Sequence, residues 1–487
     1  MVTEMQQRKV KGVKVEFADE AVTAMGGLVL VEEAARRLGM WRELEKRLPR
    51  RAKGFDWLTV IKSAVVGLLS GSQGTYASEE VREDEPLLRL LGLEGAPEEA
   101  TLWRLLKSLG EGELGEAMGR TQRQWARRVL AGGRMREMSI EGFFPIFGDG
   151  TLLEGSERRE GTKTIEGKGR GLLWGTVFTG PVLAGQRLAA EGEGEQTVVR
   201  ELLSNVMTEV IEPLKLKSRA LLLLDSLHGD GPTLEAVEKL GLPYVIGANK
   251  LTATEKTLAG RVEAEWQGTG PDEERNWAES AVCQCWLQCE EWTKKRRLIG
   301  RRWRFAGELP GVYHYSGVLA DVPDDRIEEI RKRRRVTDAE VIWLLYDHKA
   351  AMENEYKDLL DDLALHYPPC QEWVRNAGFY ALGALAHTLA RAVQILAGPL
   401  PLKHNTTQPA PAPSEATPSR SVRSAPSAEP PRRRQPRRMR LWRLRRRLFA
   451  LPARIAYHAR YLTITFLGVC ERLRREFNHF WSACCRC

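Results

Sequence analysis

The sequence lacks the usual marks of a secreted or membrane protein. No apolar stretch follows a basic start at the N-terminus, so we expect no signal peptide. Eight cysteines in 487 residues do not resemble a disulfide framework in a chain of this size. The longest apolar segment, residues 377–402, contains His387 and Arg391, which favours a buried core helix over a membrane span. Together these absences predict a reduced, cytoplasmic protein with no membrane partner.

A zinc-binding pattern is missing as well. Cysteines gather at residues 283–289 and 484–487, but without the spaced pairs and histidines that zinc sites usually show. In the first cluster, the alternation of Cys283, Cys285 and Leu287 suits a half-buried strand. We therefore expect a structural role for these cysteines.

Excess positive charge is confined to the C-terminal end. The chain has a net charge of +9, yet residues 432–487 contain 16 Arg and 2 Glu, a net of +14, which leaves −5 for the remainder. Ten of these arginines lie between Arg432 and Arg447. This asymmetry predicts that the C-terminal segment contacts a polyanion.

Residues 1–135 predict a helical N-terminal domain. Apolar residues recur at helical spacing in 28–38, 57–69 and 101–109. Such a bundle suits either a DNA-binding domain or a support for another domain, and the pattern alone does not choose between them.

Residues 140–250 predict the first part of an α/β domain. Five apolar runs are expected to be strands, at 143–147, 172–178, 181–188, 220–224 and 243–247, and helices are expected at 195–211 and 233–240. A three-stranded meander followed by crossover units builds a mixed sheet covered by helices. This order matches the ribonuclease-H-like fold.

The rest of the chain changes character several times. Residues 251–335 are polar and rich in tryptophan, which predicts an inserted, strand-bearing subdomain. Residues 336–402 are helical again and would complete the α/β domain. Residues 403–431, rich in Pro, Ala, Ser and Thr, predict a flexible linker before the basic segment 432–487.

Two aspartates are expected to meet at neighbouring strand ends. Asp149 follows the first predicted strand, and Asp225 follows the fourth, Ala220–Leu224. Paired carboxylates there suit Mg²⁺ or Mn²⁺, which prefer hard oxygen ligands. Each aspartate taken alone suits a turn equally well, and Asp230 is a competing acid in the same loop. His228 lies close enough in sequence to support a metal ligand, although a plain surface role is the alternative.

A third acid is predicted in the helix expected over residues 337–362. Tyr346, Lys349, Glu353 and Lys357 follow three- and four-residue spacings, so they would share one helix face. A tyrosine, a carboxylate and two cations on one face suit the handling of phosphate. A solvated face with ion pairs along the helix is the alternative.

With these residues, the chain resembles the DDE transposases of bacterial insertion sequences. The likeness is to the insertion-sequence-four superfamily, and within it to the insertion-sequence thirteen-eighty group. The glutamate signature of that family is a tyrosine, two residues, an arginine, three residues and the glutamate. Tyr346, Lys349 and Glu353 keep these spacings.

The resemblance covers most of the chain. Phe147–Thr151 and Leu224–Ser226 are similar to the two aspartate motifs of the family. Two positions depart from its pattern, because Lys349 replaces the signature arginine and Leu360 stands where a lysine is usual. Lysine cannot reproduce the bidentate grip of arginine on phosphate, so we expect reduced activity.

The resemblance implies DNA strand cleavage and strand transfer by two-metal-ion phosphoryl transfer. Asp149, Asp225 and Glu353 would be the catalytic residues and would bind two Mg²⁺ ions, or alternatively Mn²⁺, in each active site. Water would release a 3′-hydroxyl at the element end, and that hydroxyl would attack target DNA. The partners would be terminal inverted repeats and target DNA, held by a homodimer in the bacterial cytoplasm at the nucleoid.

DNA contacts are predicted beyond the metal site. Three residues of the signature helix would hold phosphates of the scissile strand: Tyr346, Lys349 and Lys357. Three others lie in a basic strip of the insertion, where a tryptophan would stack on a flipped base or simply build the core: Trp292, Arg297 and Trp303. The run Arg432–Arg447 would bind phosphates with little base selectivity.

Two alternatives to an active transposase remain open. In the first, substitution at Lys349 or Leu360 has disabled catalysis and left a DNA-binding relic. In the second, the same fold serves a different metal nuclease, which cleaves DNA without joining strands.

Overall fold

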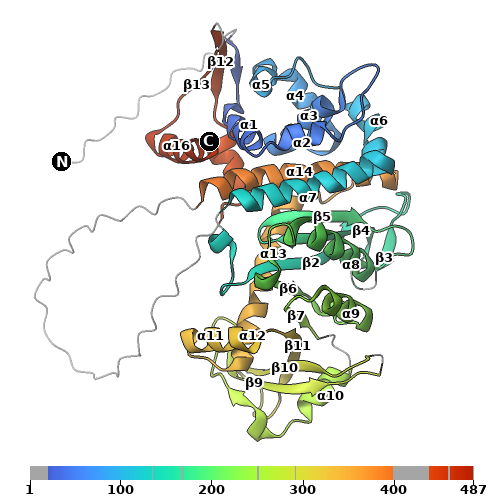
Figure 1. Ribbon diagram of the computed structural model, residues 1–487, viewed down its shortest axis with the longest axis vertical. Coiled ribbons are helices and arrows are strands. Elements are labelled where there is room, and N and C mark those ends of the chain that lie inside the picture. The colour runs from blue at the N-terminus through green and yellow to red at the C-terminus, as the bar shows by residue number, and fades with distance from the viewer. Residues whose placement is uncertain are drawn as a thin grey trace, which may run out of the picture.

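The computed structural model describes residues 20–398 and 438–485, except for residues 134, 166, 168, 249–251, 291 and 459–460. The predicted linker 403–431 lies outside the described residues, as do residues 432–437. Figure 1 shows an elongated molecule with the N-terminal helices at one end, a sheet in the middle and further strands at the other end.

Helices form the N-terminal part, as predicted. They are α1 (Val29–Arg37), α2 (Met40–Glu45), α3 (Trp57–Ser70), α4 (Ala77–Glu83), α5 (Glu85–Leu91), α6 (Glu99–Gly110) and α7 (Gly112–Gly132). Helix α3 begins at Trp57 because the Asp56 side chain accepts a hydrogen bond from the backbone N–H of Thr59 at 2.9 Å. It ends at Gly71, whose left-handed backbone favours glycine.

Helix α14 (Trp373–Ala397) runs through the middle of the molecule beside α7 (Figure 1). It is the one helix in the described part of the chain that is long and apolar enough to cross a membrane. Of its most apolar window, 89% is buried inside the protein, against α6, α7 and β5 (Val182–Leu188) among others. This burial agrees with the prediction of a core helix.

The central sheet has the predicted ribonuclease-H-like order. Its first strands are β2 (Phe144–Glu154), β4 (Gly169–Thr179), β5, β6 (Ala220–Leu224) and β7 (Tyr244–Gly247). Strands β5, β4 and β2 pair antiparallel in that order, and β6 and β7 then add parallel to β2. The crossover helices are α8 (Glu195–Val206), continued by a π-helical turn at Met207–Ile211, and α9 (Gly231–Leu240). A short strand β3 (Lys163–Ile165) also pairs with β4.

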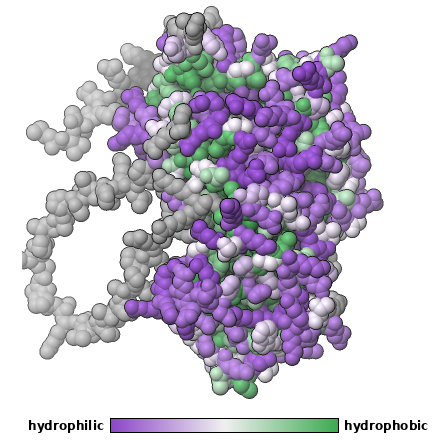
Figure 2. Space-filling view, viewed as in Figure 1, coloured by the Kyte–Doolittle hydropathy of each residue, from purple (hydrophilic) through white to green (hydrophobic). Residues whose placement is uncertain are grey.

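The insertion extends this sheet instead of forming a separate one. Its elements are α10 (Thr252–Ala259), β8 (Gln267–Gly268), β9 (Trp277–Leu287), β10 (Arg296–Phe305), β11 (His314–Asp321) and α11 (Asp324–Arg334). Strand β11 pairs antiparallel with β7, so one mixed sheet of ten strands runs through both parts. The face in Figure 2 is mainly hydrophilic, most densely over α11.

The predicted signature helix is broken into four short pieces. They are α12 (Asp338–Asp347), a 3₁₀ turn at His348–Ala351, α13 (Met352–Lys357) and a π-helical turn at Asp358–Asp362. Thr337 and Glu340 form a reciprocal capping box that starts α12. Because the turns differ in residues per turn, the regular helical spacing used to place Tyr346 and Glu353 on one face does not hold across the segment.

The C-terminal segment packs back onto the N-terminal helices. It contains α15 (Leu441–Leu444), a π-helical turn at Arg445–Phe449, β12 (Ala453–His458), β13 (Tyr461–Phe466) and α16 (Glu471–Cys484). Strand β12 lies between β13 and β1 (Val22–Thr23), which joins the two ends of the described chain in one small sheet. The close approach requires Gly27, because a Cβ there would lie 1.6 Å from the carbonyl oxygen of Leu448.

Candidate metal centre and its surroundings

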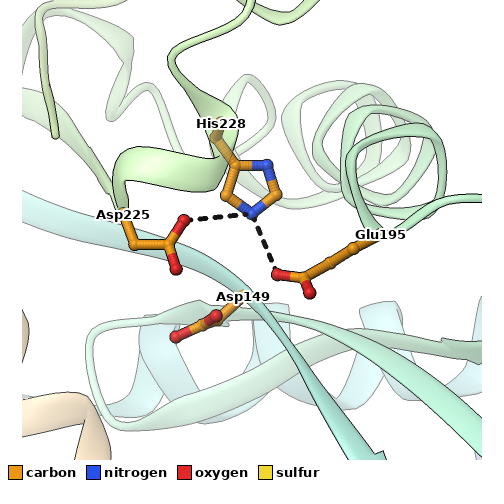
Figure 3. Close-up of side chains that lie close together, drawn as sticks. All are labelled: Asp149, Glu195, Asp225 and His228. Carbon is orange, nitrogen blue, oxygen red and sulfur yellow. Dashed lines mark ion pairs between the residues drawn. The ribbon is translucent and has the colours of Figure 1, made fainter. Parts of the chain in front are cut away.

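Four side chains that can bind a metal ion come together at one edge of the central sheet (Figure 3). They are Asp149 from β2, Asp225 directly after β6, Glu195 at the start of α8 and His228 from the turn Ser226–His228. One ligand atom from each lies within 4.8 Å of the others. We call these four residues the acidic cluster.

The sheet itself brings the two aspartates together. Parallel pairing between β2 and β6 ends at Gly148 and Leu224, so Asp149 and Asp225 come next on adjacent strands. The prediction that Asp149 ends its strand is wrong, because β2 continues to Glu154 and Asp149 pairs with Thr176 of β4. Asp149 therefore lies inside a strand that still pairs with β4 after its pairing with β6 has ended, and it does not start a turn.

Glycine 150 lets the helix α8 approach the strand. A Cβ at Gly150 would lie 2.5 Å from the carboxyl carbon of Glu195. The backbone N–H of Gly150 instead donates hydrogen bonds to Glu195 Oε1 at 3.0 Å and to Asp149 Oδ1 at 2.9 Å. One backbone amide thus orients both carboxylates.

The carboxylates of the acidic cluster repel one another. Burial raises the pKa of Asp149, and the neighbouring charges of Asp225 and Glu195 raise it further, while Lys349 acts in the opposite direction. Asp225 is better solvated, with about a third of its side chain exposed, and it accepts a hydrogen bond from the backbone N–H of Leu227 at 3.0 Å. A cation placed among these groups would relieve the repulsion.

The predicted phosphate-handling residues Lys349 and Tyr346 do face the acidic cluster. Lys349 Nζ donates to Asp149 Oδ2 at 3.2 Å. Burial raises the pKa of the Tyr346 hydroxyl, and the charges of Asp225 and Asp149 add to the effect. Tyr346 therefore stays protonated at neutral pH and remains a hydrogen-bond donor.

Tyr356 approaches the cluster from α13. Its hydroxyl lies 2.5 Å from Thr176 Oγ1, and Thr176 Oγ1 lies 3.4 Å from the backbone carbonyl oxygen of Asp149. Burial raises the pKa of Tyr356, and the charge of Asp149 raises it further. This contact fixes α13 against β4 beside the cluster.

Glu353 and Lys357 are not part of the acidic cluster. Both side chains are exposed on α13. Within the described part of the chain, no hydrogen bond or ion pair joins Glu353 to the cluster. The structure therefore brings together the two predicted aspartates with Lys349 and Tyr346, and it leaves the predicted third acid outside.

The predicted DNA-contacting residues of the insertion have partners within the protein. Arg297 pairs with Asp324 at 3.3 Å, and Arg296 lies over the ring of Trp292 at 4.9 Å. Trp303 stacks on two rings, Trp277 at 5.1 Å and His314 at 5.7 Å. Because β10 lies between β9 and β11, Trp277 and His314 flank Trp303 from the two neighbouring strands, and Trp303 is half-buried. These contacts are typical of a residue that builds the insertion, and a role of Trp303 in DNA binding stays a prediction.

Part of the C-terminal arginine run is also used inside the protein. Arg440 pairs with Asp362 at 2.9 Å and with Asp358. Arg445 donates to the carbonyl oxygen of Leu69 at 2.8 Å, near the end of α3, and Arg447 pairs with Glu476. Arg440 and Arg445 therefore attach the C-terminal segment to the rest of the protein, whereas Arg447 pairs within the segment.

In a second group of possible metal ligands, an arginine guanidinium pairs with the carboxylates. Glu355, Asp358 and His387 lie close enough to share an ion. However, Arg391, which is almost fully buried, pairs with both carboxylates. This group is therefore an ionic network between α13 and α14, and the acidic cluster is the better candidate for a metal.

The donor set of the acidic cluster fits a divalent cation. Three carboxylates and one imidazole converge there, and the Lys349 ammonium forms an ion pair with Asp149. Carboxylate oxygens suit Mg²⁺ and Mn²⁺. The sequence alone did not find Glu195, because a glutamate in the first turn of a helix is a common stabilising residue.

No family model matches the chain, and no curated protein matches it either. Among solved structures, the chain is similar to a piggyBac transposase in a synaptic complex with hairpin DNA, determined by cryo-EM. The TM-score is 0.36 at 8% sequence identity, over 75% of this chain and 73% of that chain. A likeness at this level supports no functional assignment, which has to rest on the residues of the site.

Proposed function

We propose that the protein is a DDE transposase that cleaves DNA at the ends of an insertion sequence and transfers the strands to target DNA. The observation that supports this most is the meeting of Asp149 and Asp225 where β2 and β6 stop pairing. Lys349, which keeps the spacing of the signature to Glu353, contacts Asp149 in the same place.

Asp149, Asp225 and Glu353 would hold two divalent ions, Mg²⁺ or Mn²⁺. When bound, such ions activate the attacking oxygen and stabilise charge on the leaving oxygen of the phosphodiester. The β2–β6 pair keeps the two aspartates rigid, since both strands are buried at this point. No covalent protein intermediate is needed.

Glu353 is the third acid of this proposal on two grounds. It lies four residues after Lys349 and three before Tyr356, and the side chains of both reach the surroundings of Asp149. Its own side chain is exposed and has no hydrogen-bond or ion-pair partner among the described residues, so it can turn toward the cluster without breaking such a contact. A rotation of this kind would complete the ligand set.

The signature segment would position the DNA. Lys349 and Lys357 supply positive charge to phosphates of the scissile strand, and the protonated Tyr346 hydroxyl donates a hydrogen bond. The partners would be terminal inverted repeats and target DNA. A homodimer would pair two element ends, and the protein would act in the bacterial cytoplasm.

The test uses the full-length protein with DNA that carries the inverted repeats flanking its gene. We expect nicking at the repeat ends and joining to a target plasmid in Mg²⁺ or Mn²⁺. Asp149→Asn, Asp225→Asn and Glu353→Gln should abolish cleavage and leave end binding intact. The control is Asp230→Asn, because Asp230 pairs with Arg200 at 3.6 Å instead of joining the cluster. Normal cleavage by Asp225→Asn would show that the assigned metal ligands are wrong.

A second candidate function is a DNA-binding relic without catalysis. The observation in its favour is that the Lys349 ammonium lies 3.2 Å from Asp149 Oδ2, an oxygen that a metal would use. Binding of the repeat ends without nicking in either ion would favour this candidate. Cleavage without strand joining would instead favour a metal nuclease on the same fold.

A further inference from the structure

The histidine of the acidic cluster has an unusual environment. His228 is fully buried, and neither ring nitrogen has a hydrogen-bond partner among the described residues. Burying a polar group without a hydrogen-bond partner is unfavourable, so such a histidine calls for an explanation. Figure 3 shows its ring pointing a nitrogen into the space between Asp225 and Glu195.

The distances around His228 Nε2 are wrong for hydrogen bonds. Nε2 lies 3.4 Å from Glu195 Oε1 and 3.8 Å from Asp225 Oδ1. Hydrogen bonds from nitrogen to oxygen are usually about 2.7–3.2 Å long. By contrast, two atoms that each bind one metal ion at about 2.1 Å lie roughly 3.0–3.4 Å apart. The separation to Glu195 Oε1 falls within this range, and the separation to Asp225 Oδ1 is longer.

The local fold explains why the imidazole reaches this place. Asp225 accepts a hydrogen bond from the backbone N–H of Leu227, which closes a 3₁₀ turn at Ser226–His228. This turn folds the chain back, so that the His228 side chain lies on the same side of the turn as the Asp225 carboxylate. Glu195 is fixed opposite by the Gly150 amide.

We propose that His228 Nε2 is a nitrogen ligand of the metal centre and makes the centre prefer Mn²⁺ over Mg²⁺. The inference rests on the proposed function only in that the cluster binds a divalent cation. Glu195 Oε1 and Asp225 Oδ1 are the oxygens that share this ion with the imidazole. Mn²⁺ belongs to the first-row transition ions that bind mixed nitrogen and oxygen sites, whereas Mg²⁺ is held by oxygen ligands and water, which gives the preference its direction.

Metal binding without DNA is the direct test. Mn²⁺ is added to the metal-free, full-length protein, and pulsed electron paramagnetic resonance measures the coupling of the ion to ¹⁴N. We expect the wild-type spectrum to show a nitrogen bound directly to the ion. Because this measurement uses the wild-type protein, it does not depend on the folding of a variant. A Mn²⁺ spectrum without such coupling overturns the proposal.

Titration calorimetry with Mn²⁺ and Mg²⁺ separates ligation from a purely structural role. His228→Asn should weaken Mn²⁺ binding by about tenfold or more and change Mg²⁺ binding much less, while the ¹⁴N coupling disappears. The matched control is His387→Asn, since His387 is also buried beside a carboxylate, Glu355 at 3.5 Å, but belongs to the network that Arg391 fills. Equal losses for both ions in His228→Asn would contradict the assignment.

The outcomes also distinguish this inference from the proposed function. Nitrogen coupling in a protein that does not cut the element ends would support the ligand assignment and overturn the transposase. Cleavage that depends on Asp149 and Asp225, together with a Mn²⁺ spectrum lacking nitrogen coupling, would overturn the ligand assignment alone.

Discussion

Asp358 should be the residue whose loss most weakens the attachment of the C-terminal segment. It is fully buried and accepts hydrogen bonds from Arg391, from Arg440 and from the backbone N–H of Leu441 at 3.3 Å. Arg391 belongs to the core helix α14, whereas Arg440 and Leu441 belong to the C-terminal segment. One carboxylate therefore joins the end of the signature segment, the core and the C-terminus.

The expected decrease in the free energy of unfolding depends on the ion pairs that remain after Asp358 is substituted. Removing one partner of a buried ion pair costs about 3–5 kcal/mol, because the other charge is left buried. In Asp358→Asn, however, Arg391 keeps Glu355, Arg440 keeps Asp362, and the amide still offers one acceptor oxygen. We therefore expect a decrease in the free energy of unfolding near the lower end of that range, about 3 kcal/mol.

The chain provides a matched control three residues away. Asp361 also lies near Arg440, at 3.9 Å, but about two-thirds of its side chain is exposed. Exposed ion pairs contribute less than about 1 kcal/mol, so Asp361→Asn should change little. Urea unfolding followed by tryptophan fluorescence measures both variants, and limited proteolysis shows whether the C-terminal segment is released in Asp358→Asn. Equal destabilisation by the two substitutions would refute the reasoning from burial.

Three further predictions concern acid stability, the signature lysine and the aromatic stack. Burial alone would raise the pKa of Glu355, but Arg391 and His387 hold it at about 2, below the ordinary 4.5, so its stabilising contribution is present above pH 4.5 and is lost as the pH falls toward 2. Urea midpoints measured across that range should therefore vary less in Glu355→Gln than in wild type, and an equal slope would contradict the ion pair. Lys349→Ala should lower the rate of DNA nicking by about 10²-fold through misplacement of Asp149, and Lys349→Arg should nick at least as fast as wild type; a faster Lys349→Ala would show that the ion pair inhibits. Trp303→Ala should destabilise the protein by about 1–3 kcal/mol in urea unfolding, because the half-buried ring loses its contacts with Trp277 and His314, whereas a variant of wild-type stability that binds DNA less tightly would favour a role in base stacking.

Much of the α/β fold was predictable because its strands carry local signals. The run Ala220–Leu224 is fully buried as β6, as expected for a strand covered on both faces. The usual strand order, a meander followed by crossover units, is enough to predict that β2 lies beside β6. With that order known, the approach of Asp149 to Asp225 follows, and the structure places them together.

The signature segment shows where helical spacing stops being informative. A regular helix over 337–362 would have placed Tyr346, Lys349 and Glu353 on one face. The 3₁₀ turn at His348–Ala351 shifts the register, so Lys349 meets Asp149 while Glu353 is exposed. Packing of Tyr356 on Thr176 and of Glu355 on Arg391 decides this register, and neither contact is visible in the local sequence.

The sequence by itself determined the order of the strands, the placement of two aspartates at adjacent positions and the basic character of the C-terminus. Only the tertiary structure decided which other side chains join the two aspartates and which groups pair with the C-terminal arginines. Glu195 and His228 enter the acidic cluster through a helix and a turn whose patterns look ordinary, and Arg440, Arg445 and Arg447 are taken up by acids and carbonyl groups far away in the chain. The reason is physical. Hydrophobic periodicity is a local property of the chain, whereas pairing of charges depends on which distant residues the packed core brings within a few ångströms.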